Sequence, residues 1–118
     1  MPLAAKLTDK GTQHDGYYET VITAGSSTVF IDGLPAARQG DPLTPHAKPK
    51  HPPHPRKIAR GSSTVFIDGL PAARTGDAID CGGVVIGGGT VNIGWYVWEV
   101  FMSLKGLRFT LEVDGQEP

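Results

Sequence analysis

A perfect internal duplication constrains the fold of this chain more than any other feature of its sequence. The fourteen residues GSSTVFIDGLPAAR occupy positions 25–38 and again positions 61–74. Both copies continue through one variable residue into Gly-Asp, and a degenerate third copy, GGGTVNIG, spans positions 87–94. Since each repeat of such an array is one supersecondary unit, we expect three related units in one small domain.

Each unit carries the residues of a short β-hairpin. In the first copy, residues 28–31 are β-branched or aromatic, and Asp32-Gly33 is a hairpin turn signal. Pro35 lies at the start of the return segment. This place suits proline, which is tolerated in a sheet only at a strand start, an edge or a bulge. The 16 glycines and 10 prolines also favour tight turns over long helices. We predict an all-β fold in which short hairpins close around an axis, with pseudo-threefold symmetry within one chain.

The segment between the two perfect copies has a different composition. Residues 42–55 hold six of the ten prolines and three of the four histidines, which are His46, His51 and His54. The segment is basic, and no acidic residue follows it before Asp68. Composition alone favours a solvated, polyproline-like loop here.

The spacing of nitrogen and sulfur side chains indicates a metal site. A ligand residue recurs at nearly the same offset after the aspartate of each unit. The pairs are Asp9 with His14, five residues on, Asp41 with His46, five residues on, and Asp77 with Cys81, four residues on. If the units surround an axis, these side chains converge, and one more histidine completes a His₃Cys set. Structural zinc prefers such a closed tetrahedral set, and iron is the alternative metal.

The fourth ligand is His51 or His54. His54 lies seven residues before Gly61, and Cys81 lies six residues before Gly87, so the phase of the repeat favours His54. The alternative to a metal site is that the histidines are loop residues in water and the cysteine is buried and neutral. The metal ligands that we predict are His14, His46, His54 and Cys81.

Several of these sequence words together resemble the PAAR-repeat family. They are PAAR at 35–38 and 71–74, DCGG at 80–83 and TVNIG at 90–94, and the resemblance covers about residues 1–94. It implies a small conical β-domain with a metal near its apex, held by three histidines and one cysteine. The positions that match this ligand pattern are His14, His46, His54 and Cys81.

The resemblance also implies a function and a set of partners. The broad face of such a domain docks onto the blunt end of the trimeric valine-glycine-repeat spike of type VI secretion systems and related phage-like tails. The expected role is a structural zinc-binding tip that caps and sharpens the spike, aids puncture of target envelopes and carries effectors. A transient contact with the target-cell membrane would follow.

Other function classes fit the sequence less well. A catalytic zinc keeps a position open for water, whereas four ligands are available here, so we expect no enzymatic activity and no small-molecule substrate. The basic stretch at 48–60 lacks the aromatic residues that stack on bases, and the net charge is −1. A zinc-dependent enzyme or a nucleic-acid-binding module therefore remains the alternative, and we expect no binding of nucleic acid.

The ends of the chain give two further expectations. The start, MPLAAKLTDKG, has no apolar run long enough for a signal peptide. We therefore expect synthesis in the cytoplasm without a signal peptide and delivery outside the cell by the contractile machine. Residues 95–118 are expected to form a short extension, as a hairpin or a helix and strand, that packs on the cone of residues 1–94 or contacts a partner.

Overall fold

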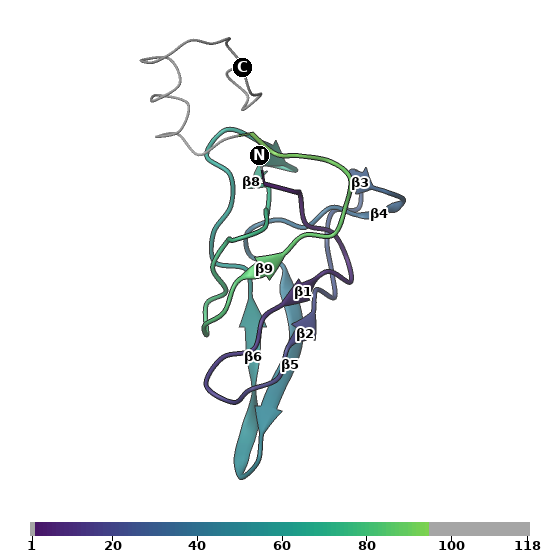
Figure 1. Ribbon diagram of the computed structural model, residues 1–118. Coiled ribbons are helices and arrows are strands. Elements are labelled where there is room, and N and C mark those ends of the chain that lie inside the picture. Colours follow the sequence, from purple (N-terminus) through teal and green to yellow (C-terminus); the bar gives the residue numbers. More distant parts are fainter. Residues whose placement is uncertain (1, 95–118) are drawn as a thin grey trace, which may run out of the picture.

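The computed structural model describes residues 2–94, and Figure 1 shows them as a domain of short strands. The strands are β1 (Lys10–Gly11), β2 (Thr20–Val21), β3 (Phe30–Ile31), β4 (Leu34–Pro35), β5 (Pro42–Lys48), β6 (His51–Lys57), β7 (Phe66–Ile67), β8 (Leu70–Pro71) and β9 (Val85–Ile86). These residues contain no helix, and hence none that could cross a membrane. The predicted all-β class is confirmed. The predicted extension, residues 95–118, lies outside the described residues.

Strand β1 lies at the centre of a small antiparallel sheet. It pairs with β2 on one side and with β9 on the other, in the order β2-β1-β9. Because β1 and β9 are far apart in the sequence, this sheet joins the first part of the domain to its last part. The other strands pair with their sequence neighbours as the hairpins β3–β4, β5–β6 and β7–β8.

The two identical copies fold into matching hairpins. Their paired residues are Phe30 with Pro35, Ile31 with Leu34, Phe66 with Pro71, and Ile67 with Leu70. The Asp-Gly pair between the strands has positive φ at both residues, 52° and 81° in the first copy and 54° and 81° in the second. Two successive positive φ angles are typical of the type I′ turn, for which Asp-Gly is a preferred sequence. The hairpins predicted for the two perfect copies are confirmed.

The third copy, residues 87–94, does not form the strand that the sequence predicts. Its pairing in the structure is an isolated bridge between Leu3 and Asn92. Asn92 stands where the other copies have phenylalanine, and Gly94 stands where they have the turn aspartate, so the strand and turn signals are both weakened. Ile93 is nevertheless buried, like the isoleucines at the same position of the other copies.

A closed cycle of backbone hydrogen bonds joins three buried alanines. The N–H of Ala37 donates to the carbonyl of Ala5 at 2.9 Å, that of Ala73 to Ala37 at 3.0 Å, and that of Ala5 to Ala73 at 3.0 Å. Ala5 belongs to the segment Ala-Ala-Lys at 4–6, whose match to Ala-Ala-Arg of the two perfect copies was not predicted from the sequence. The cycle supports an arrangement around an axis. Pseudo-threefold symmetry of the whole domain stays a prediction.

The three alanine segments contribute to two clusters of buried side chains. Successive residues of an extended segment point to opposite sides, so the first and second alanines enter different clusters. The first cluster contains Ala4, Ala36, Ala72, Ile31, Ile67 and Ile93. The second contains Ala5, Ala37, Ala73, Ile22, Leu43, Ile58, Ile79 and Val85, and Cys81 packs against it. The second cluster therefore supports one of the predicted metal ligands.

The proline-rich segment forms a paired hairpin, so the prediction of a loop from its composition is wrong. Its strands, β5 and β6, are the longest in the described part of the chain. The register joins Pro42 to Lys57, Leu43 to Arg56, His46 to His54 and Lys48 to His51, with irregularities between these pairs. Proline cannot donate to the ladder but is accepted at bulges and strand starts. Figure 1 shows this teal hairpin reaching away from the broad end that carries β3, β4 and β8, so its turn forms the narrow end.

Candidate metal centre

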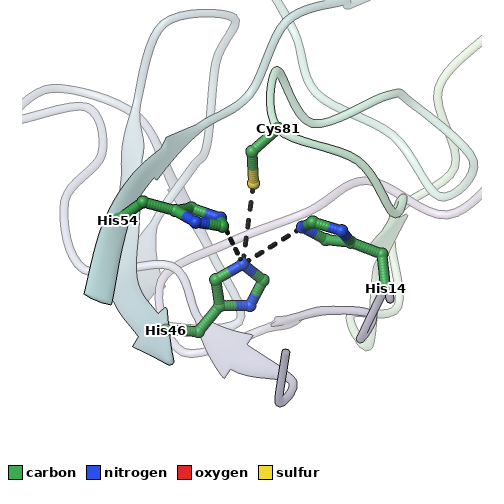
Figure 2. Close-up of side chains that lie close together, drawn as sticks. All are labelled: His14, His46, His54 and Cys81. Atoms are coloured by element: carbon green, nitrogen blue, oxygen red, sulfur yellow. Dashed lines mark hydrogen bonds between the residues drawn. The ribbon is translucent and has the colours of Figure 1, made fainter. Parts of the chain in front are cut away.

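The four side chains predicted as ligands lie together beside the β5–β6 hairpin (Figure 2). His14 comes from the loop between β1 and β2, His46 from β5, His54 from β6 and Cys81 from the loop between β8 and β9. Their donor atoms all lie within 4.8 Å of one another. The Nε2 atom of His46 is 3.2 Å from that of His14, 2.8 Å from that of His54 and 3.7 Å from the Sγ atom of Cys81. His46 is therefore at the middle of the cluster.

Local backbone geometry explains how distant segments meet here. His46 and His54 are directly paired across the β5–β6 ladder, which places their side chains next to each other. His14 and Tyr17 exchange backbone hydrogen bonds around a turn in which Asp15 and Gly16 have positive φ. Beside Cys81, a Cβ atom on Gly82 would lie 3.0 Å from the His14 ring, so glycine lets the two loops approach.

The environment of His46 prepares it for metal binding. Its side chain is buried, and burial lowers the pKa of His46, with the nearby charge of Arg56 acting in the same direction. The Tyr18 carbonyl lies 2.6 Å from Nδ1. Since a carbonyl can only accept, Nδ1–H donates to it, and the lone pair of the neutral ring is on Nε2. Nε2 is the atom that faces the other three residues, and such a backbone partner is typical of a metal-binding histidine.

Tyr17 forms an aromatic wall against the histidines. The centre of its ring lies 4.4 Å from that of His54, 5.0 Å from that of His46 and 5.4 Å from that of His14. The Nζ atom of Lys48 lies over the Tyr17 ring, 4.7 Å from its centre. Tyr17 was not predicted from the sequence, although its place just after the Asp15-Gly16 turn is a local signal that it folds back towards His14.

The donor set fits one tetrahedral metal ion. Zinc bonds of about 2.0–2.1 Å to nitrogen and 2.3 Å to sulfur separate two nitrogens by about 3.3 Å, and nitrogen from sulfur by about 3.6 Å. The spacings around His46 Nε2 are 3.2, 2.8 and 3.7 Å. The cluster could therefore hold a metal ion with small movements of the rings. The identity of the metal is a separate question.

The two candidates for the fourth ligand lie in different places. His54 belongs to the cluster, whereas His51 is exposed at the start of β6 and lies opposite Lys48. The grouping agrees with the phase of the repeat, which favours His54. Metal binding by these four residues stays a prediction.

The repeat aspartates have a structural role. The backbone N–H three residues before each one donates to its carboxylate, as at Lys6 with Asp9, Arg38 with Asp41, and Arg74 with Asp77. The side chain of the same basic residue also pairs with that carboxylate. Each aspartate therefore closes a local turn in its unit.

The fold and the site together define a class: a small all-β domain with repeated hairpins at one end and a His₃Cys cluster towards the other. A family model described as the PAAR motif matches residues 10–87, which include all four cluster residues. The match covers more than half of the chain, so the chain belongs to the PAAR motif family. No curated protein matches the chain.

Proposed function

We propose that this chain is the structural, metal-stapled tip of the trimeric spike of a type VI secretion system or a related contractile tail. One observation carries the proposal. In a member of the PAAR motif family, four donor atoms from four segments converge within 4.8 Å beside the hairpin that forms the narrow end. A PAAR tip is a structural part of the spike, so the chain would act by shape and stiffness and would catalyse no reaction.

The proposed metal is a structural zinc ion, with iron as the alternative. His14, His46, His54 and Cys81 would hold it and fill all four positions. A bound zinc ion would crosslink the His14 loop, the β5–β6 hairpin and the Cys81 loop, and such sites stabilise small domains by about 10 kcal/mol. This crosslink would keep the narrow end rigid when it is driven against a target envelope.

The broad end has the apolar surface that docking onto a spike requires. Phe30 and Phe66, at the same position of the two perfect copies, are 56% and 55% exposed. Leu3, Val29, Leu70 and Val91 are exposed as well. We propose that this face covers the blunt end of a trimeric valine-glycine-repeat protein, where unpaired strand edges need a cap. One chain with three alanine segments in a cycle would meet three spike subunits.

Further roles follow from a position at the tip. The chain would be made in the cytoplasm, leave the cell with the spike, touch the target membrane briefly and help to carry an effector. It would bind neither nucleic acid nor a small-molecule substrate.

The decisive experiment is co-purification with the spike trimer of the same secretion system. Native mass measurement should give one chain and one metal ion per spike trimer. A complex of three chains with three spike subunits, or binding to nucleic acid in place of the spike, would overturn the tip model. Hydrolysis that depends on the metal would favour the enzyme alternative.

A further inference from the structure

Arg56 is a buried charge outside the ligand set. It is 2% exposed, and among the described residues no carboxylate forms an ion pair with it. Its Nε atom is buried and finds no hydrogen-bond partner there. Burying a guanidinium in this way is costly, and an apolar side chain would fill the same space more cheaply. The cost suggests that Arg56 does something that an apolar residue cannot do.

The hydrogen bonds of Arg56 end on the two loops that carry ligands and on the strands that flank one of these loops. Nη1 donates to the carbonyl of Gly11 at 3.2 Å and to the hydroxyl of Thr20 at 3.1 Å. Nη2 donates to the carbonyl of Thr12 at 2.7 Å and to that of Gly82 at 3.1 Å. These acceptors flank the two ligands that come from loops, because Thr12 lies two residues before His14 and Gly82 directly follows Cys81.

Arg56 is also connected to His46 and His54, through the β5–β6 ladder. Arg56 lies on β6, two residues after His54, and is paired with Leu43 of β5, the strand that carries His46. Glycines make room for its guanidinium. A Cβ atom on Gly83 would lie 3.0 Å from Nη2, and one on Gly11 would lie 3.2 Å from Nη1. A single planar group therefore touches or adjoins every segment that contributes a ligand.

We propose that Arg56 is a positioning residue of the metal centre, which holds the His14 loop and the Cys81 loop against the β5–β6 hairpin so that the four donors converge. The inference rests on the proposed function in that the cluster binds a metal. Arginine suits the task because its rigid planar fork presents five N–H donors in fixed directions, whereas lysine has three donors on one nitrogen at the end of a flexible stem.

The test compares Arg56→Lys and Arg56→Met with the matched control Arg74→Lys. Arg74 is also a buried arginine, but it donates to Asp77 and to the carbonyl of Gly61, within the second repeat. We measure the rate at which zinc-loaded protein releases zinc to an excess of chelator, together with the thermal midpoint. Both arginine sites should show a lowered midpoint. Release should become at least about tenfold faster in the Arg56 variants alone, since partners of metal ligands have effects of that size.

Equal acceleration in Arg74→Lys would show that Arg56 acts through general stability, and unchanged release in folded Arg56 variants would overturn the proposal too. Should the Arg56 variants fail to fold, Thr20→Val removes one acceptor of Nη1 and keeps the β-branched shape of a strand residue. Its control is Thr23→Val, because the Thr23 hydroxyl donates to the Pro42 carbonyl and does not contact Arg56. Faster release in Thr20→Val alone supports the proposal, and equal rates contradict it.

A readout without metal separates this inference from the proposed function. If the wild-type chain takes up no zinc, the metal site itself fails. The packing of the Cys81 loop can then be followed through the accessibility of its thiol, measured as the rate at which iodoacetamide alkylates Cys81 in the metal-free protein. Arg56→Lys should raise this rate and Arg74→Lys should leave it unchanged. Equal rates in the two variants would overturn the positioning role.

Discussion

The broad end and the narrow end of this domain are held together in different ways. At the broad end, two identical hairpins repeat the same turn, and backbone hydrogen bonds join the alanine segments that follow them in the sequence, with residues 4–6, in a cycle. Towards the narrow end, three imidazoles, one thiol and the guanidinium of Arg56 bring unlike loops together. The first arrangement depends on backbone and small residues, and the second depends on a few particular side chains. The broad end should therefore survive changes that loosen the narrow end.

The largest expected effect is on the narrow end, through loss of the metal. Protein purified without added metal should contain close to one zinc ion per chain, and Cys81→Ala should lower the free energy of unfolding by on the order of 5 kcal/mol, because the shell loses its thiolate. Elemental analysis and denaturant unfolding measure the two quantities. Hydrogen exchange should show lost protection at Thr12 and Gly82 and retained protection at Ala37. An unchanged thermal midpoint after chelation would contradict the metal centre.

The opposite change is an aspartate at the broad end. Phe66→Asp should abolish binding to the spike trimer, because docking would bury an unpaired charge. The metal content should stay near one ion per chain, since Phe66 is on β7, outside the ligand cluster. Pull-down and elemental analysis on the same sample read both ends at once. Full spike binding by this variant would show that the exposed apolar face is not the docking surface.

A pair of histidines sharpens the comparison within the narrow end. His54→Ala should release the metal readily, because it removes one of four donors. His51→Ala should leave occupancy near one, because His51 is exposed and outside the cluster. Metal retained after dialysis is the measurement, and the two variants serve as controls for each other. The reverse result would make His51 the fourth ligand.

The features predicted correctly from the sequence were local or repeated. The Asp-Gly turns determine the two hairpins over a few residues. The recurring offset pointed to His14, His46 and Cys81, which the structure brings together, although their binding of a metal stays a prediction. The place of His54 in the cluster agrees with the same repeat phase. These signals are strong because each of them occurs more than once in the sequence.

The features that were missed depend on contacts between distant segments. Proline content suggested a loop at 42–55, whereas irregular pairing lets β5 and β6 form a ladder. The segment 4–6 joins the alanine cycle through partners more than thirty residues away, and its sequence match is short. Arg56 looked like one more charge in a basic stretch, because its burial arises only when the loops close over it.

The smallest expected effect compares the two identical copies with each other. Their turn aspartates have the same neighbours in sequence but different partners. Asp32 accepts hydrogen bonds from the backbone and hydroxyl of Thr90. Asp68 accepts from the hydroxyls of Ser26 and Thr28 and pairs with Arg38. Asp68→Asn should therefore lower the thermal midpoint more than Asp32→Asn does, although both aspartates are exposed and both effects should be small.

Acid should remove this difference. The pKa of Asp32 is held below the ordinary value of 3.8, mainly by the hydrogen bond from the Thr90 side chain. The pKa of Asp68 is also held below 3.8, mainly by the hydrogen bond from the Ser26 side chain. A carboxylate with a lowered pKa stabilises the fold above its unfolded pKa, and this stabilisation is lost as the pH falls through the folded pKa. The two variants should therefore differ from wild type at pH 7 and approach it below about pH 4. Melting metal-free protein at both pH values avoids the loss of metal in acid, and equal midpoints at pH 7 would show that the neighbouring unit does not distinguish the two copies.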